Sequence, residues 1–197
     1  SCNKLPLLIA SELDGKYKRS MHRDVERILI NEEEIRDRLD FVAKKVMAEF
    51  ACDGLVVVIL LKGALVFAAD MCRRLPVKMT VECLNISSYH GGIKTSGKVE
   101  FLDRKMPEVK GKKVLIMDDI LDTGLTMRAV SDALLELGAV EVRNCVLLNK
   151  RKQRTGECEA DFKAFDIDDE FVIGYGLDYQ GRYRNLPYVG VMKQASI

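Results

Sequence analysis

Three carboxylates lie within five positions in the stretch VLIMDDILDTGLTM, residues 114–127. Asp118 and Asp119 are adjacent, and Asp122 follows them directly before a Thr-Gly pair. Acids at this spacing can bind sugar hydroxyls, hold a divalent cation or move a proton. The Asp-Thr-Gly triplet at 122–124 also matches the catalytic triplet of aspartic proteases, so the surrounding residues must decide between two unrelated chemistries.

The neighbouring elements favour a ligand site at a sheet edge over a protease site. Residues 112–120 contain the apolar run VLIM, as expected of a buried strand, and residues 123–138 have helical spacing that ends at Gly138. An aspartic protease needs a β-rich fold and a second copy of the triplet, and this sequence holds no second copy. A strand that leads through an acidic turn into a helix instead places a ligand at the carboxyl end of a parallel sheet.

The start of the predicted helix suits a phosphate group. The backbone N–H groups of residues 123–126 can surround a phosphate, assisted by the helix dipole and by the hydroxyls of Thr123 and Thr126. Carboxylates beside a phosphate repel it unless they bind neutral sugar hydroxyls or a divalent cation that lies between them. The stretch therefore predicts a site for a ribose 5-phosphate.

The rest of the chain alternates between strands and helices. Residues 31–50 have helical spacing behind Asn31, which suits an N-cap. The apolar run at 54–63 predicts a strand buried on both faces, and helical spacing follows at 64–75. This alternation predicts an α/β fold with a doubly wound, mostly parallel sheet, and we expect residues 1–197 to form one domain. Further strands are predicted at 78–89, 140–150, 160–167, 171–179 and 188–192.

Composition limits the partners that the chain can have. Its 197 residues are 48% hydrophobic and 31% charged, which is typical of a single globular domain. With 31 basic and 30 acidic residues, no overall field attracts nucleic acid or an anionic membrane. The six cysteines form no CxxC pair, and the N-terminal residues lack the pattern of a signal peptide. We expect a cytoplasmic protein with reduced thiols and with no nucleic-acid or membrane partner.

One long stretch, at 90–111, is rich in glycine and charge and has no predicted element. A loop of this length is typically a functional lid or disordered, and we expect a mobile loop at about 88–111. Residues 92–98 match most of a P-loop, but Val99 stands where a Ser or Thr would hold magnesium, and an extended segment follows in place of a helix. The sequence therefore disfavours a nucleotide kinase or an ATPase.

The stretch at 114–127 resembles the phosphoribosyl pyrophosphate signature of the type I phosphoribosyltransferases, which is a hydrophobic strand, two acids, two hydrophobic residues and Asp-Thr-Gly-x-Thr. Four further segments resemble the 6-oxopurine branch of that family, the hypoxanthine-guanine phosphoribosyltransferases, and occur in its order. They are LLKG at 60–63, SSYHGG at 87–92, LLNKRKQR at 147–154 and FVIGYGLDYQGRYRNLPY at 171–188. The resemblance covers about residues 25–193.

This resemblance implies the type I phosphoribosyltransferase fold, with a small hood over the purine base formed by the terminal segments. It also implies an activity in purine salvage. A 5-phosphoribosyl group would pass from phosphoribosyl pyrophosphate to N9 of hypoxanthine or guanine, with xanthine as a third candidate, and pyrophosphate would be released. Magnesium as the cofactor and a homodimer or homotetramer are implied as well.

The resemblance also assigns roles at the sugar and the phosphate. Asp118 and Asp119 match acids that bind the ribose hydroxyls, often with magnesium nearby. Asp122 matches a residue near N7 of the purine, where it accepts the proton lost as the glycosidic bond forms. From the residues alone, Asp122 could instead cap the following helix, and both roles can coexist. The matched 5'-phosphate loop is Thr123, Gly124, Leu125 and Thr126.

The pyrophosphate side of the site is implied by three segments. Lys62 and Gly63 match the pyrophosphate loop, in which family members have a cis peptide bond before the lysine. Ser88 and Tyr89 match the start of a lid that closes over the reaction centre and excludes water. Arg184 matches a residue that contacts the pyrophosphate.

The base side is implied by the C-terminal half of the chain. Lys150 matches a lysine that donates to the 6-oxo group, a contact that adenine cannot accept. The residues alone also allow a solvated basic turn or a weak nucleic-acid patch there. Phe171 matches an aromatic residue that stacks on the base, although it could also be a core residue, and Val172 matches one whose backbone reads the far edge of the ring. Asp178 lies on the base side as well, and the implied magnesium ligands are Asp178, Asp118 and Asp119.

Two positions depart from the family pattern, namely Asp118, where many relatives carry Glu, and Leu125, where some carry Lys. Neither changes a catalytic role. Two other functions stay open, a phosphoribosyltransferase for another base and a regulator that binds phosphoribosyl pyrophosphate without catalysis. Such regulators typically carry a DNA-binding module or a basic RNA-binding face, and this sequence shows no helix-turn-helix extension and a balanced charge.

Overall fold

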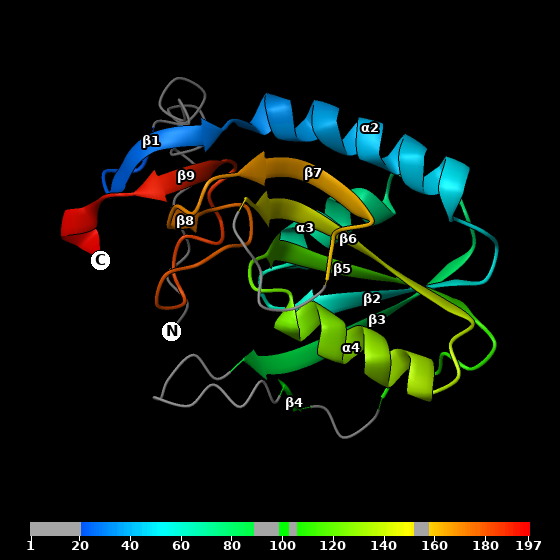
Figure 1. Ribbon diagram of the computed structural model, residues 1–197. Helices are drawn as coiled ribbons and strands as arrows, with labels where there is room; N and C mark the ends of the chain where they lie inside the picture. The colour runs from blue at the N-terminus through cyan, green and yellow to red at the C-terminus, as the bar shows by residue number, and fades with distance from the viewer. Residues whose placement is uncertain (1–20, 89–98, 103–105, 152–157) are drawn as a thin grey trace, which may run out of the picture.

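The computed structural model describes residues 21–88, 99–102, 106–151 and 158–197. These residues form a six-stranded sheet of order β4-β3-β2-β5-β6-β7 and a three-stranded sheet of order β1-β9-β8. Figure 1 shows helices on the large sheet and the small sheet beyond the ends to which its parallel strands point. The predicted α/β fold with a mostly parallel sheet is confirmed.

The large sheet is parallel throughout, except at one edge. The apolar run predicted as a buried strand forms β2 (Leu55–Leu61), which lies between β3 (Met79–Ser88) and β5 (Lys113–Leu121). Burial on both faces explains why β2 reads as a continuous apolar run. The remaining strands of this sheet are β6 (Glu141–Lys150), β7 (Phe162–Ile167) and the antiparallel β4 (Val99–Phe101).

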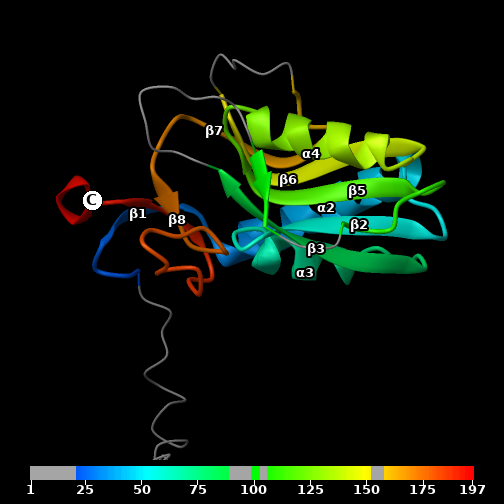
Figure 2. The same ribbon diagram turned by 90° about the horizontal axis from the view of Figure 1, so that it is seen from below.

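Helices cover both faces of the large sheet, with α4 on one side and α2 and α3 on the other (Figure 2). Helix α2 (Glu32–Glu49) begins with the predicted cap, because the Asn31 side chain accepts from Glu34 N–H while the Glu34 carboxylate accepts from Asn31 N–H. The other two helices are α3 (Leu65–Cys72) and α4 (Leu125–Glu136). No helix within the described ranges is both long and apolar enough to cross a membrane.

The small sheet brings together segments from the two ends of the described chain. Strand β1 (Val25–Ile30) pairs antiparallel with β9 (Val189–Met192), which also pairs with β8 (Val172–Ile173), and a 3-10 turn follows at Gln194–Ser196. A separate apolar cluster, formed by Val25, Ile173, Tyr188 and Met192, holds this sheet together. We call residues 21–30 and 171–193 the hood segment, after the role that the resemblance implies for them.

Two details differ from the sequence prediction, and the first is strand β1, which was not predicted. Strand β4 matches the extended segment expected after residue 98, inside the predicted loop. The strand predicted at 171–179 ends at Ile173, because Gly174, Tyr175 and Gly176 have φ angles of 96°, 51° and 103°, which extended backbone cannot have. Much of the predicted loop at 88–111 lies outside the described residues, and the single-domain organisation stays a prediction.

Candidate active site

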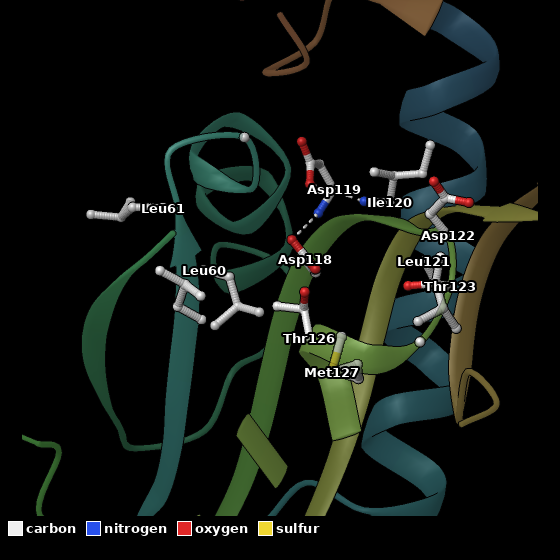
Figure 3. Close-up of a pocket in the computed structure, with 13 residues that line it drawn as sticks. Leu60, Leu61, Asp118, Asp119, Ile120, Leu121, Asp122, Thr123, Thr126 and Met127 are labelled. Carbon is white, nitrogen blue, oxygen red and sulfur yellow. Dashed lines mark hydrogen bonds between the residues drawn. The ribbon is translucent and has the colours of Figure 1, made fainter. Parts of the chain in front are cut away.

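Asp118 and Asp119, which we call the acid pair, lie at the carboxyl end of β5, on the wall of a cavity of about 250 Å³ (Figure 3). Gly63, from the turn after β2, forms the neighbouring wall. Because parallel strands end at the same edge of a sheet, the turns after β2 and β5 meet at this point. The lining residues are Leu60, Leu61, Gly63, Ile86, the run from Asp118 to Gly124, Thr126 and Met127.

The two carboxylates are held by backbone N–H groups of their own turn. Asp118 Oδ1 accepts from Asp119 N–H at 2.9 Å, and Asp119 Oδ1 accepts from Ile120 N–H at 3.0 Å. Burial, and then the charge of Asp119, raise the pKa of Asp118 well above its usual range. Burial also raises the pKa of Asp119, against hydrogen bonds and the Arg184 guanidinium, which lower it. Binding of a proton or a cation next to the two carboxylates is therefore favoured, because it neutralises their buried charge.

Replacing Asp118 tests this electrostatic cost. Below the unfolded-state pKa of about 3.9 the carboxyl contributes stability, and that contribution is lost as the pH rises through the raised native pKa, because the native state binds the proton more tightly. Asp118→Asn stays neutral at every pH. We expect it to raise Tm at pH 7.5 by a few degrees, at about 2–4 °C per kcal/mol, and to raise it less toward pH 4.

Differential scanning calorimetry at the two pH values measures this effect. The matched control is Asp37→Asn, which removes an exposed carboxylate of α2 that pairs with the adjacent Arg36 at 3.3 Å. The control should leave Tm nearly unchanged at both pH values. A loss of Tm in Asp118→Asn at pH 7.5, or a gain of equal size at both pH values, would contradict the explanation.

The predicted phosphate loop leads into α4. Gly124 is the N-cap with φ 82°, a left-handed conformation that favours glycine, and Leu125 N–H donates to Thr123 Oγ1 at 3.4 Å. The first N–H groups of a helix have no acceptor within the helix, and Gly124 and Thr126 line the cavity. The helix starts at Leu125 and not at 123, so Asp122 is not its N-cap, and Asp122 lines the cavity instead.

Gly63 lies between the acid pair and the hood segment. A Cβ added at Gly63 would lie 1.8 Å from Asp119 Oδ2, so no side chain fits there without moving that carboxylate. On the other side, a Cβ added at Gly176 would lie 2.1 Å from the Gly63 carbonyl oxygen. The peptide bond between Leu61 and Lys62 is cis, as the resemblance implies. The turn after β2 therefore contacts both the acids and the hood segment.

Arg184 and Asp178 form an ion pair beside this contact. Arg184 Nη2 lies 2.6 Å from Asp178 Oδ1, and Arg184 Nη1 donates to the Gly176 carbonyl at 2.6 Å. Asp178 Oδ2 accepts from Gly181 N–H at 2.7 Å. The Arg184 charge also lowers the pKa of Asp119, which places it within electrostatic range of the acid pair. A metal at Asp178 would thus share that carboxylate with Arg184.

The residues predicted for the base lie where β6 ends and β8 begins. The Lys150 side chain is 14% exposed, and its Nζ lies 2.7 Å from Asp169 Oδ1. Phe171 is 44% exposed and meets Tyr179 edge to face at 5.6 Å between ring centroids, so it is not the core residue that the residues alone allowed. Val172 is buried and pairs with Val191.

The structure brings part of the predicted site together in one cavity. Its lining includes Gly63, the three acids and every residue of the phosphate loop except Leu125. Outside the lining lie the other predicted residues of the described chain, namely Lys62, Lys150, Phe171, Val172, Asp178 and Arg184. The backbone of Ser88 ends β3 and pairs with Val99, and Tyr89 is outside the described residues. Two residues were missed, Gly176 and Asp169. The two closely spaced glycines in GYGLDY and the acid run DIDDE were the available signals.

Comparison with known proteins gives consistent matches over most of the chain. A model of the phosphoribosyl transferase domain matches residues 24–180. The chain is 36% identical over 173 residues to a hypoxanthine-guanine phosphoribosyltransferase of Staphylococcus epidermidis, which covers 88% of this chain and 97% of that protein.

Solved structures agree with the sequence comparison. A hypoxanthine phosphoribosyltransferase from Staphylococcus aureus superposes with a TM-score of 0.84 and 34% identity, covering 89% of this chain and 96% of that one. A hypoxanthine phosphoribosyl transferase of Trypanosoma cruzi gives a TM-score of 0.84 and 35% identity, covering 90% and 96%. The similarity thus extends over the large sheet and the hood segment.

Proposed function

Because the chain belongs to the phosphoribosyl transferase family, in its hypoxanthine-guanine branch, we infer that it is a purine salvage enzyme. It transfers the 5-phosphoribosyl group of phosphoribosyl pyrophosphate to a 6-oxopurine and releases pyrophosphate. The observation that carries this inference is the single cavity at the carboxyl ends of β2 and β5, in which the acid pair, Asp122 and the start of α4 face one volume.

Each wall of this cavity suits one part of the ribosyl donor. The N–H groups at the start of α4 and the Thr126 hydroxyl suit the 5'-phosphate, and the carboxylates of Asp118 and Asp119 suit the ribose hydroxyls. Gly63 lines the same cavity from the turn after β2, so the backbone of that turn can face the pyrophosphate. The Arg184 guanidinium, whose charge lowers the pKa of Asp119, can stabilise the negative charge that develops on the departing pyrophosphate.

The base takes the remaining side of the site. Phe171 offers an exposed ring on which a purine can stack, and Lys150, at the end of β6, can donate to its 6-oxo group. An ammonium carries three N–H donors, so the ion pair with Asp169 does not by itself prevent this contact. Asp122 accepts the proton lost by the base as N9 bonds to the sugar, in a displacement with oxocarbenium-like character.

Magnesium fits the acid pair as part of its coordination shell. Within the described ranges, no group of three Asp, Glu, His or Cys side chains is arranged to hold a metal ion by itself. Mg²⁺ typically takes one or two carboxylates, with water and substrate oxygens completing the shell. Asp118 and Asp119, with pKa values raised by burial, would gain from a cation that keeps them ionised. When bound, the ion would neutralise charge on the pyrophosphate. The homo-oligomer and the cytoplasmic location stay predictions.

A panel of bases tests the function directly. Purified protein is mixed with phosphoribosyl pyrophosphate, magnesium and one base at a time, and both nucleotide and pyrophosphate are measured. We expect turnover with hypoxanthine or guanine and none with adenine or a pyrimidine. Adenine as the best substrate would overturn the assignment of Lys150, and no pyrophosphate release with any base would favour a regulator that binds the donor without catalysis.

Lys150→Ala is expected to weaken recognition of the 6-oxo group. Loss of a hydrogen bond from a charged donor should lower kcat/KM for hypoxanthine by about 10- to 150-fold. The matched control is Lys163→Ala, which removes another strand lysine, paired with Asp166 at 2.8 Å on β7. Steady-state kinetics should show wild-type values for the control. An unchanged kcat/KM in Lys150→Ala would remove Lys150 from the base site.

A further inference from the structure

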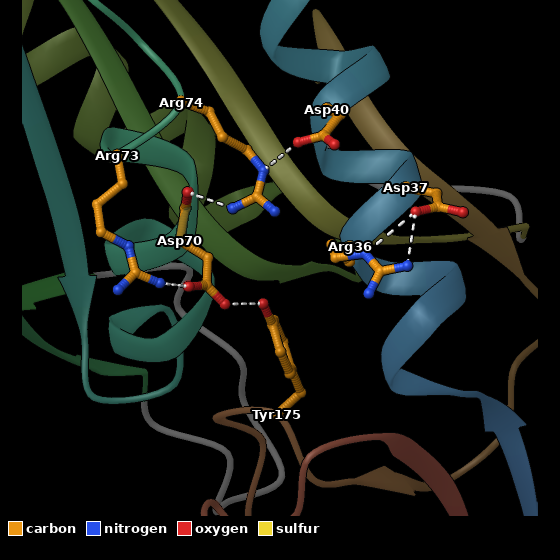
Figure 4. Close-up of polar contacts among 7 residues, drawn as sticks. All are labelled: Arg36, Asp37, Asp40, Asp70, Arg73, Arg74 and Tyr175. Carbon is orange, nitrogen blue, oxygen red and sulfur yellow. Dashed lines mark hydrogen bonds and ion pairs between the residues drawn. The ribbon is translucent and has the colours of Figure 1, made fainter.

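A hydrogen bond joins the hood segment to the helix behind the pyrophosphate loop. The Tyr175 hydroxyl donates to the Asp70 carboxylate, 105 residues away in the sequence (Figure 4). Tyr175 lies two residues after the end of β8, and Asp70 lies on α3, which begins two residues after Gly63. This contact, which we call the Tyr175–Asp70 tether, connects the base side of the site to the pyrophosphate side.

The backbone at Tyr175 is shaped for this contact. Its φ of 51° is in the left-handed region, which a tyrosine adopts only when its surroundings hold it there. In this conformation the residue is only 6% exposed and packs in the core cluster on the face of the large sheet that α2 and α3 cover. The next residue, Gly176, packs on the Gly63 carbonyl. Two consecutive residues of the hood segment thus contact the pyrophosphate loop and the helix that follows it.

Asp70 is in turn oriented from its own helix and from α2. Its carboxylate pairs with Arg73, and its backbone oxygen accepts from Arg74 Nη1 at 2.8 Å. Arg74 Nε donates to Asp40 of α2 at 2.6 Å, as Figure 4 shows. Burial, and then the hydrogen bond to Asp70, raise the pKa of Tyr175 above its usual range, so the hydroxyl stays a donor at any assay pH.

We propose that Tyr175 and Asp70 are positioning residues that fix the separation between the base side and the pyrophosphate loop. The inference rests on the proposed function, since it concerns how two substrates of one reaction are aligned. The reacting atoms of the base and the sugar must approach to about 3–3.5 Å, and small misplacements cost rate. Neither residue lines the cavity at the acid pair, so both act through the segments that they hold.

The two substrates should respond differently to loss of the tether. Phosphoribosyl pyrophosphate also has the acid pair and the start of α4 to hold it, whereas the base depends on residues at the hood and at the end of β6. In Tyr175→Phe we therefore expect KM for hypoxanthine to rise about tenfold, the effect of roughly one net hydrogen bond, and KM for phosphoribosyl pyrophosphate to stay within about twofold. A smaller folded fraction would lower kcat and move neither KM.

Variants of Asp70 test whether the effect depends on the pair. Asp70→Ala removes the acceptor and should give the same split between the two KM values. Asp70→Asn keeps an acceptor for the Tyr175 hydroxyl, so, unlike Asp70→Ala, it should have a KM for hypoxanthine near the wild-type value. The double variant Tyr175→Phe with Asp70→Ala should be no worse than either single variant, because both remove the same contact.

Tyr183→Phe is the matched control. Its hydroxyl donates to Asp24 Oδ2 at 2.8 Å, which is also a tyrosine–aspartate bond but one that stays within the hood segment. Both KM values should stay within about twofold in this control. Unchanged or equally raised KM values in Tyr175→Phe, or the same split in the control, would overturn the tether alone. A wild-type protein without transferase activity would instead overturn the proposed function and, with it, the tether.

Discussion

Asp122→Asn is expected to lower kcat by about 10²- to 10⁴-fold, the range typical of losing a general base. Asparagine has nearly the same size and can still occupy the cavity wall, but it cannot take the proton that leaves the purine. Because the main role assigned to Asp122 is to take the proton of the base, KM for phosphoribosyl pyrophosphate should change less than kcat. Steady-state kinetics with hypoxanthine and varied donor concentration measure both quantities.

A control for this variant should remove a carboxylate that accepts a hydrogen bond from a backbone N–H group but lies far from the site. Asp161 satisfies this condition, since its Oδ2 accepts from Asn144 N–H at 2.8 Å just before β7 begins, at the opposite end of that strand from the cavity. Asp161→Asn should lower Tm without changing kcat per folded molecule. A wild-type turnover rate in Asp122→Asn would contradict the assignment of Asp122 as the general base.

The central strands and the acid site could be predicted because their signals are local. A parallel strand covered on both faces is apolar at nearly every position. The apolar runs of β2 and of the first half of β5 can therefore be recognised in the sequence without knowing which strands pair with them. Asp118, Asp119 and Asp122 stand in one short motif whose strand and helix lie directly beside them. The prediction succeeded where one segment contains both the chemistry and the element that positions it.

The hood segment could be predicted only in part. Strands β8 and β9 lie within the predicted strands at 171–179 and 188–192, whereas β1 and the turn after β8 depend on distant residues. Strand β1 has two adjacent charged residues, Glu26 and Arg27, and its pairing with β9 joins the two ends of the described chain. The sequence around Tyr175 has the composition of a strand, yet its backbone turns because Gly176 packs on Gly63 and the Tyr175 hydroxyl reaches Asp70. Contacts between residues so far apart in the sequence cannot be predicted from a local sequence pattern.

Gly63 is the position where the packing of the site leaves the least freedom, and Gly63→Ala should therefore have a large effect. The added Cβ would lie 1.8 Å from Asp119 Oδ2 and 2.5 Å from its Cγ, so either the carboxylate or the turn after β2 must move. A displacement of about 1 Å in a catalytic site can cost about 10²-fold in rate. We expect kcat/KM for phosphoribosyl pyrophosphate to fall by about that factor or more.

The effect of Gly63→Ala must be separated from the general cost of adding a methyl group to a turn. Gly111→Ala provides this comparison, because a Cβ there meets nothing within 4 Å, although the φ of 72° makes any side chain strained. That control should lose about 1–2 kcal/mol of stability and keep its kcat/KM. If Gly63→Ala lost stability alone, as Gly111→Ala does, the carboxylate of Asp119 would not need its observed position. A loss of kcat/KM confined to Gly63→Ala would instead show that the turn after β2 and the acid pair work as one unit, since the added methyl group would lie against the Asp119 carboxylate.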